Sequence, residues 1–497
     1  MADLTRRQFV RRAGGAVAAA GLGSQLEWLA GCGSGGSSPP DFTRLARELK
    51  GLLVLPADRF YRAVSTPLNH RYANVHPQAV ALCASADDAR KSLLWARDNE
   101  MPVAVRSGGH NYAGYSNTPG LLISFDRMKR VVVDDAHNSL VVEPGARNTD
   151  VYRGLQPHGV AISAGRCPSV AIGGLTLGGG VGFSSRKLGL TCDRLVEAEV
   201  ITADGKVRTC SERENSDLFW ALRGGGGGNF GISTSYKFET HPVSDVTLYS
   251  LEWDWAHAPK VFAAFQKAMA AAPDEFSARI GMGRPGQPNG KPGPPTVTAL
   301  GQFFGPKKEL VALLDPALTA AKPKQQLIAR RTFWQAKNYF FATTPYGYYE
   351  VKSAYAHEPL SSAGIETLAR WVDKWPGSSN GDGAGMAMFL SGGAINRVPA
   401  DATAFVHRDD FALIAMETTW AAEDPKSVSR RGLDWIEGMA DALQPHVSGF
   451  AYQNFIDRAQ KNWQHAYYGS NFKRLEEVKR RYDPDDVFRF KQSIPLS

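Results

Sequence analysis

Glycines gathered in three short stretches constrain this chain more than any other feature of its sequence. They are Gly108-Gly109, the run from Gly173 to Gly182 and the block from Gly224 to Gly228. Because glycine has no side chain, backbone N–H groups there can approach an anionic group closely and cradle a diphosphate. The glycines do not follow the G-x-G-x-x-G pattern of a Rossmann turn between a long strand and a helix. The sequence therefore predicts a dinucleotide site built from a different loop geometry.

The segments around these glycines predict regular structure instead of a flexible linker. Residues 101–106 form an apolar, β-rich run, so His110 is expected in the loop that follows a strand. Residues 217–222 are typical of an amphipathic helix and residues 230–238 of a strand, so the glycine block between them is embedded in the fold. On its own, a histidine after two glycines is more often an ordinary loop residue than a functional one.

Four motifs in succession carry a family resemblance. They are R-S-G-G-H at 106–110, G-R-C-P-S-V at 165–170, the glycine run at 173–182 and D-L-F-W-A-L-R-G-G-G-G-G-N-F-G at 217–231. This set resembles the berberine bridge enzyme-like FAD-linked oxidases of the PCMH-type (vanillyl-alcohol oxidase) superfamily. The resemblance implies that FAD is bonded to the protein twice, at its 8-methyl carbon by the histidine of the first motif and at ring carbon C6 by the cysteine of the second.

The resemblance also assigns a set of cofactor-binding residues around these attachment points. It includes one residue of the C-terminal segment, which is expected near the isoalloxazine ring. The full set is Arg106, Ser107, Gly108, Gly109, His110, Asn111, Ser116, Cys167, Val170, Gly173, Gly174, Gly178, Gly179, Gly182, Gly228, Asn229, Gly231, Ile232 and Asn454. No C-x-x-C or H-x-x-x-H cluster appears in the sequence, so we expect no catalytic metal.

The resemblance implies an α+β fold in three parts. A two-lobed PCMH-type FAD-binding domain is expected at 41–245, and an α+β substrate domain with an antiparallel sheet at 246–449. The C-terminal segment at 450–497 is expected to return and complete the FAD domain.

Local patterns refine this division. A clear amphipathic helix at 86–97 precedes the histidine strand, and we expect the two lobes of the FAD domain to divide near Asp150. An Asp-Gly turn between alternating strands predicts a hairpin over 200–209. Longer helices at 258–272 and 363–371, alternating with strands, favour a second domain packed over the flavin.

The cofactor defines the reaction that the resemblance implies. A flavin accepts a hydride from a carbon that bears a hydroxyl group, while a base removes the hydroxyl proton, and molecular oxygen then reoxidises the flavin and yields hydrogen peroxide. The expected partner is a small-molecule substrate that bears a hydroxyl group, namely a sugar, a glycoside, or a phenolic or secondary alcohol. Two alternatives stay open: a dehydrogenase that passes electrons to a quinone or protein, and a surface-tethered binding lipoprotein without catalysis.

The catalytic base is where the sequence departs from the family. Many alcohol-oxidising members read Y-x-N-Y, with the final tyrosine as base, whereas this chain has Phe455 there, which cannot accept a proton. We expect Tyr452 to be the base, with Tyr355 next, on the assumption that Tyr452 and Asn454 lie on one face of an extended segment and that the flavin or a cation lowers the phenol pKa. His407 is expected to be structural.

Other tyrosines leave an alternative open. Tyr346, Tyr348 and Tyr349 are further candidates for acid–base chemistry, but they suit a stacking surface for a sugar or aromatic ring at least as well.

The N-terminal residues are typical of a targeting signal. Residues 1–32 contain Arg6-Arg7, which resembles a twin-arginine export signal, and then an apolar stretch that ends in Leu-Ala-Gly before Cys32, which resembles a lipobox. Residues 33–40 are a Gly/Ser-rich tether. We expect a periplasmic or extracellular protein held at the membrane by a lipidated Cys32; the alternative is that Cys32 is an incidental thiol near an ordinary cleavage site.

Composition excludes several other classes. The chain has 497 residues, 43% of them apolar and 21% charged, which suits a globular protein with two domains. It lacks a run of 18 apolar residues, so we expect no spanning helix. The formal net charge of +8 is dispersed, so we expect no nucleic-acid partner. Five cysteines are too few and too scattered for a disulfide scaffold.

Overall fold

The structure is a computed structural model that describes residues 40–341 and 347–496. Residues 42–497 form one compact unit that contains three main sheets. Because this unit is not divided further, the domain boundaries at 245/246 and 449/450 stay predictions. The export signal and the lipidation site lie outside the described residues.

The first sheet has the strand order β1-β2-β4-β3. Its strands are β1 (Leu52–Val54), β2 (Ala79–Leu82), β3 (Val103–Arg106) and β4 (Leu121–Ser124), with β1 antiparallel to β2 and the other pairs parallel. Helices α2 (Thr43–Glu48), α3 (Tyr61–Ser65) and α4 (Ala86–Asp98) accompany them. The Ser85 hydroxyl caps α4 by accepting a hydrogen bond from the Asp88 N–H at 3.3 Å. The expected helix at 86–97 and the strand before His110 are confirmed.

The second sheet is antiparallel, with the order β5-β6-β10-β8-β9. Its strands are β5 (Val131–Asp134), β6 (Ser139–Val142), β8 (Leu195–Ile201), β9 (Val207–Ser211) and β10 (Ile232–Glu239). Helices α5 (Asn148–Leu155), α6 (Ile172–Leu177), α7 (Ser185–Leu188) and α8 (Ser216–Leu222) belong to this part, as does the small pair β7 (Val160–Ala161) and β11 (His241–Pro242).

Two expectations are settled by this sheet. The hairpin at 200–209 is confirmed, since β8 pairs with β9 and Gly205 turns the chain at φ 76°. The lobe division near Asp150 is wrong. Both β5 and β6 hydrogen-bond within the second sheet, so the chain passes from one sheet to the next between Ser124 and Val131.

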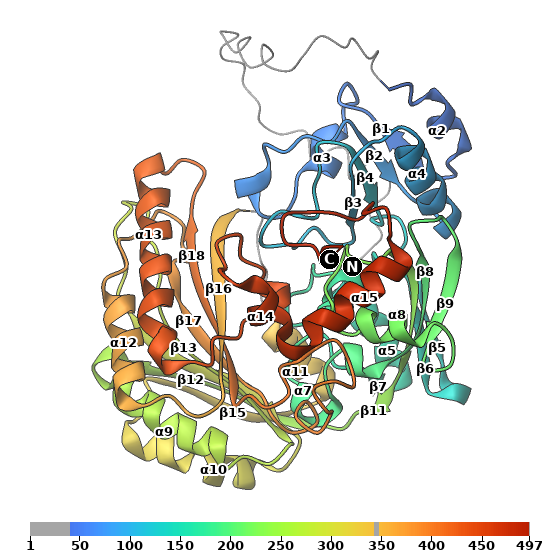
Figure 1. Cartoon of the computed structure of the whole chain (residues 1–497). Coiled ribbons are helices and arrows are strands. Elements are labelled where there is room, and N and C mark those ends of the chain that lie inside the picture. The colour runs from blue at the N-terminus through green and yellow to red at the C-terminus, as the bar shows by residue number, and fades with distance from the viewer. Residues whose placement is uncertain (1–39, 342–346, 497) are drawn as a thin grey trace. The chain divides into compact units, whose positions relative to one another are not determined.

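The third sheet has seven antiparallel strands in the order β15-β12-β14-β13-β17-β18-β16 (Figure 1). They are β12 (Val246–Asp254), β13 (Phe276–Arg284), β14 (Thr296–Phe303), β15 (Gln325–Arg331), β16 (Tyr348–Ala356), β17 (Ala384–Leu390) and β18 (Ala412–Trp420). The helices of this part are α9 (Ala258–Ala270), α10 (Lys307–Ala320), α11 (Phe333–Phe340), α12 (Ser362–Asp373) and α13 (Lys426–Leu443).

Alternation along these strands separates a core face from a cavity face. On β13, Phe276, Ala278, Ile280 and Met282 pack into the hydrophobic core beneath α9, α10, α12 and α13. Since successive side chains of a strand point to opposite faces, Arg279 and its alternate neighbours point away from that core.

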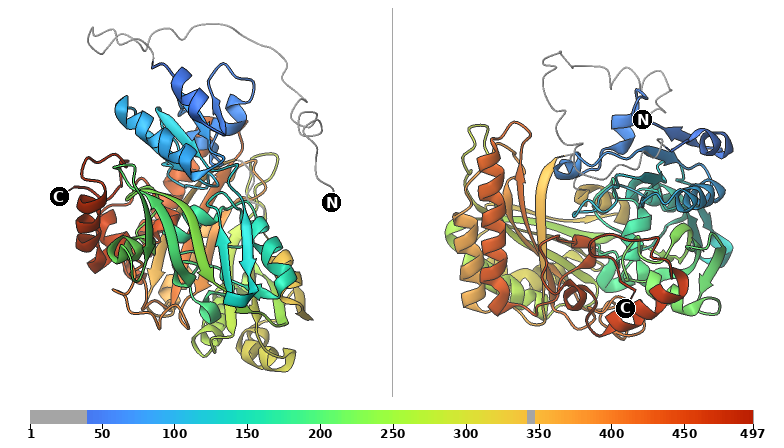
Figure 2. Two further views of the ribbon diagram at one scale, coloured as in Figure 1. Left: turned by 90° about the vertical axis from the view of Figure 1, so that its right-hand side faces the viewer. Right: turned by 45° about the horizontal axis from the view of Figure 1, so that its top comes forward.

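The C-terminal segment returns to the cofactor lobe, as expected. Helix α15 (Phe472–Tyr482) lies beside α8, and α14 (Trp463–Tyr468) adjoins α15; both C-terminal helices are red in Figures 1 and 2. The buried Lys479 ammonium donates to the backbone oxygen of Asn229 at 3.2 Å, and the Ile494 N–H donates to the Asn229 side chain at 3.0 Å. The last residues of the chain therefore fix the end of the third glycine stretch. Within the described ranges, no helix is both long enough and apolar enough to cross a membrane.

Candidate functional site

A cavity of about 900 Å³ lies where the glycine-rich segments meet the third sheet. Its walls come from the loop after β3, the segment 165–183, the glycines at 226–228, the cavity faces of β13, β17 and β18, and residues 452–456. A cavity of this size with a few convergent polar groups is the usual form of a ligand or cofactor site.

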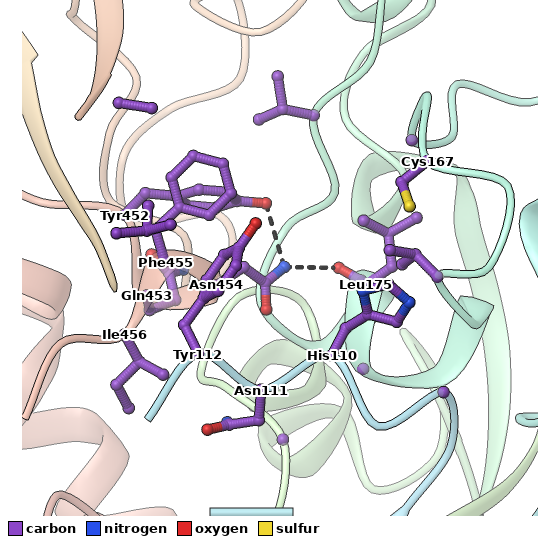
Figure 3. Close-up of a pocket in the computed structure, with 18 of the residues that line it drawn as sticks. His110, Asn111, Tyr112, Cys167, Leu175, Tyr452, Gln453, Asn454, Phe455 and Ile456 are labelled. Carbon is purple, nitrogen blue, oxygen red and sulfur yellow. Dashed lines mark hydrogen bonds between the residues drawn. The ribbon is translucent and has the colours of Figure 1, made fainter. Parts of the chain in front are cut away.

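His110 and Cys167 meet on one wall of this cavity (Figure 3). Both contact the Ser169 hydroxyl, His110 through Nε2 at 3.1 Å and Cys167 through Sγ at 3.5 Å. Burial lowers the pKa of His110 to about 4, so its imidazole is neutral at physiological pH. A neutral imidazole has a free lone pair, which makes it competent as a nucleophile.

Glycine is required where the segments of this wall touch. A Cβ atom on Gly108 would lie 2.7 Å from the backbone nitrogen of Ala171. The histidine loop can therefore pack directly against the cysteine segment only because residue 108 is glycine. A Cβ atom on Gly178 would overlap the Asn454 side chain. These contacts are tighter than carbon atoms tolerate, so the glycines let three distant segments converge.

Two hydroxyl groups on this side of the cavity lack a protein partner. Tyr115 and Ser116 line the cavity, and within the described part of the chain their buried hydroxyls make no hydrogen bond. Buried hydroxyls are usually hydrogen-bonded, because an unmet group costs about 1–3 kcal/mol. The donor set therefore fits a bound group that carries many acceptors and donors, as FAD does.

The structure brings most of the expected cofactor residues to the cavity wall. Those that line it are Ser107, Gly108, Gly109, His110, Asn111, Ser116, Cys167, Val170, Gly174, Gly182, Gly228, Asn229, Gly231 and Asn454.

The remaining expected residues do not line the cavity, and their part in cofactor binding stays a prediction. They are Arg106, Gly173, Gly178, Gly179 and Ile232. The Arg106 guanidinium donates to the backbone oxygens of Ser116, Val64 and Ser65 and so holds the histidine loop in place.

Tyr452 and Asn454 approach each other, although the segment is not extended. Asn454 lies in a 3₁₀ turn (Gln453–Phe455), so the expectation of an extended segment is wrong. The turn nevertheless brings the Asn454 amide within 3.1 Å of the Tyr452 hydroxyl, and the same amide donates to the Leu175 backbone oxygen at 3.0 Å (Figure 3). The Gly180 N–H also donates to the Tyr452 hydroxyl, at 2.9 Å.

The electrostatic environment of Tyr452 differs from the expectation. Burial raises the pKa of Tyr452 to about 12, and the hydrogen bonds from Asn454 and Gly180 oppose this rise without cancelling it. The expected lowering of the pKa is therefore not found in the protein alone. The two donors do favour the phenolate, because both point at the phenol oxygen.

Other tyrosines divide between the cavity and the core. Tyr355 is 2% exposed, its ring stacks on His407 at 4.2 Å, and it is not part of the cavity wall. His407 is buried as well, which agrees with a structural role. Tyr112 lines the cavity and contacts Phe455 and Tyr349 edge to face. Of the other two tyrosine candidates, Tyr348 is outside the wall and Tyr346 lies outside the described residues.

Sequence reasoning missed three charged residues of the cavity wall. Arg166, Arg279 and Glu417 line the cavity. Burial lowers the pKa of Arg279 to about 10, and burial also raises the pKa of Glu417. A charged residue in the middle of a mostly apolar strand was the signal available for Arg279. Ser169, which joins the two attachment residues, was visible inside the cysteine motif.

Comparison with known proteins identifies the family. Family models described as "FAD binding domain" and "Berberine and berberine like" match residues 77–211 and 451–495. An uncharacterized FAD-linked oxidoreductase of Bacillus subtilis, YgaK, is 37% identical over 459 residues, which cover 90% of this chain and 97% of that protein. The chain belongs to the berberine bridge enzyme-like FAD-linked oxidoreductases.

Two further relatives of this berberine bridge enzyme-like chain agree. Glucooligosaccharide oxidase of Sarocladium strictum is 31% identical over 444 residues, which cover 83% of this chain and 86% of that protein. The solved structure of Physcomitrella patens BBE-like 1 has a TM-score of 0.84 at 29% identity and covers 92% of this chain and 100% of that one. The expected fold, a PCMH-type FAD-binding architecture with antiparallel sheets, is confirmed.

Proposed function

We propose that this oxidoreductase holds FAD by two covalent bonds, at His110 and Cys167, and oxidises a hydroxyl-bearing substrate. The observation that carries the proposal is the shared contact of both side chains with Ser169 on the cavity wall, at 3.1 and 3.5 Å. One small ring system in this corner can reach both side chains. The neutral imidazole of His110 supports its part in this attachment.

The substrate side of the proposal rests on the arrangement of the cavity. When bound, FAD would take up a hydride from the carbon that carries the hydroxyl group and pass the electrons to molecular oxygen, with release of hydrogen peroxide. Tyr452 would take the hydroxyl proton, because its oxygen lies in the cavity wall beside Asn454. The third sheet would exclude water from the opposite side. That a similar protein is named glucooligosaccharide oxidase supports an oligosaccharide or glycoside as the substrate class.

The test is removal of each attachment residue. His110→Ala and Cys167→Ala should each leave flavin covalently bound through the other residue, and the double variant should release it on acid precipitation. Intact-mass spectrometry gives the bound mass in each case, and Ser169→Ala is a control that keeps both attachment residues. Release of all flavin by one single substitution would refute the two-bond proposal. Peroxide formation during turnover separates an oxidase from a dehydrogenase.

We also propose export by the twin-arginine route and attachment to the membrane through Cys32. The support is the sequence alone, namely Arg6-Arg7 before an apolar stretch and Leu-Ala-Gly before Cys32. This route carries folded proteins, which suits an enzyme whose cofactor is inserted before export. Cys32→Ala should convert a membrane-bound product into a soluble one in cell fractionation.

A further inference from the structure

Two arginines line the cavity and have no anion to pair with in the described part of the chain. Arg279 lies on the cavity face of β13, and Arg166 directly precedes Cys167. Within residues 40–341 and 347–496, neither guanidinium forms an ion pair or a hydrogen bond, and Nε of Arg279 is buried without a partner. A buried guanidinium such as that of Arg279 is almost always paired, because an unmet buried charge is costly.

The two guanidinium groups also act on each other. After burial, the positive charge of Arg166 is the next cause that lowers the pKa of Arg279. Like charges that approach in a partly dehydrated cavity repel, and a ligand anion between them would remove both the repulsion and the unmet hydrogen-bond donors.

Glu417 does not fill this role. It lines the same cavity from β18, and its negative charge favours both guanidinium groups, yet it forms an ion pair with neither within the described ranges. Burial raises the pKa of Glu417, and the positive charges of Arg166 and Arg279 oppose this rise. The two arginines therefore still lack a carboxylate that pairs with them.

One row of the sheet near Arg279 carries only small side chains, whereas the row paired with Arg279 itself carries Phe389 and Leu413. A Cβ atom on Gly281 would lie 3.1 Å from the Arg279 guanidinium, so this guanidinium extends over the glycine. Gly281 pairs with Ala387 on β17, which pairs with Ala415 on β18, and all three line the cavity. Neighbouring strands are about 4.8 Å apart, so these three strands give a flat floor about 10 Å wide, which is enough for one ring of a substrate.

We propose that the substrate carries a carboxylate, that Arg279 and Arg166 bind it, and that the ring of the substrate lies on the floor formed by Gly281, Ala387 and Ala415. This inference rests on the proposed function, since Arg166 adjoins the proposed attachment point at Cys167. A guanidinium matches a planar carboxylate with two parallel hydrogen bonds. The nearby Glu417 favours this singly charged group over a doubly charged phosphate, because like charges repel.

The test compares acid and neutral ligands that differ only in the carboxylate. Isothermal titration of the holoenzyme would use methyl glucuronide against methyl glucoside, and vanillate against vanillyl alcohol; the first pair represents a sugar acid and the second a phenolic acid. In at least one pair, the acid should bind about 10- to 100-fold more tightly than the neutral partner. Equal binding within both pairs would overturn the inference.

Variants assign the preference to the arginines. Arg279→Gln should reduce the ratio of acid to neutral affinity to near one, whereas Glu417→Gln should increase it, since the substitution removes a like charge. Arg330→Gln, on the exposed edge strand β15, makes the same charge change away from the cavity and should leave the ratio unchanged. An acid preference that survives in Arg279→Gln would contradict the assignment.

Failure of the inference is separable from failure of the proposed function. Titration needs no turnover, so it decides the carboxylate preference whether or not the flavin is reduced. Covalent flavin that is reduced by neutral alcohols, with no preference for acids in titration, would overturn only the inference. Absence of covalent flavin would overturn the two-bond proposal while the titration result stands.

Discussion

Replacement of Tyr452 by phenylalanine tests the proposed base directly. The substitution keeps the ring, which is buried against Phe405 and Phe455, and removes only the hydroxyl group. Loss of a general base typically costs about 10²- to 10⁴-fold in rate, or about 3–5 kcal/mol in the barrier. Binding should change little, since the phenol oxygen is already occupied by donors from Gly180 and Asn454.

The pKa of Tyr452 adds a second, independent expectation. With a pKa of about 12, about one molecule in ten thousand carries the phenolate at pH 8, which corresponds to about 5 kcal/mol. Because burial raises this pKa above the working pH, the fraction of Tyr452 phenolate increases about tenfold per pH unit. The rate of flavin reduction should increase by the same factor below the pKa. Tyr452→Phe should abolish that slope.

The assay is anaerobic stopped-flow reduction of the flavin at saturating substrate. Tyr348→Phe is the matched control, because Tyr348 packs on Trp420 outside the cavity wall. Thermal unfolding should show a loss of about 1–3 kcal/mol in Tyr452→Phe, since the Gly180 N–H loses its acceptor. A reduction rate within about threefold of the parent, with an unchanged pH profile, would show that Tyr452 is only a wall of the pocket.

Three further predictions concern export and stability. A reporter fused to residues 1–40 should lose export when Arg6 and Arg7 are both changed to lysine; equal export in a fractionation assay would reject the twin-arginine signal. Burial lowers the pKa of Lys337 to about 7, below the unfolded value of about 10.4, so the unfolded chain binds more protons between these pH values. The free energy of unfolding should therefore rise from pH 7 to about 10 by up to about 1.4 kcal/mol per unit, and Lys337→Met should flatten this rise in denaturation measured across pH; an unchanged slope would contradict the assignment. Asp193→Asn should cost about 3–5 kcal/mol in the same measurement, because it leaves the buried Arg408 guanidinium without its two-bond partner, whereas a loss below about 1 kcal/mol would show that the pair is dispensable.

The sequence predicted the parts of the site that follow from local pattern. The strand before His110, the helix before the glycine block and the hairpin at Gly205 each depend on neighbouring residues, and each is present. The lobe division failed because the pairing of β5 and β6 with β10 is a long-range contact that no local signal marks. The extended path from Tyr452 to Asn454 failed for a similar reason, since packing against Gly178 and Leu175 selects a turn.

The charged wall could not be predicted because it depends on alignment between strands. Arg279 and Glu417 are far apart in the chain, and only the register of β13, β17 and β18 brings them to one cavity. Their pKa shifts depend on burial, which no linear pattern shows. The opposite direction of the Tyr452 pKa shift has the same origin.

The two hydrogen bonds from Lys479 and Ile494 to Asn229 have a consequence for the order in which the protein matures. Ile494 lies 265 residues after the side chain that it holds, and a ribosome that adds about 5–20 residues per second needs about 10–50 s to make that stretch. Until then the glycine block lacks the contacts from Lys479 and Ile494. The end of the glycine block is therefore fully held only after translation is complete, and chains that stop short of the last residues lack these two contacts. We expect such truncated chains to retain less cofactor than the whole polypeptide.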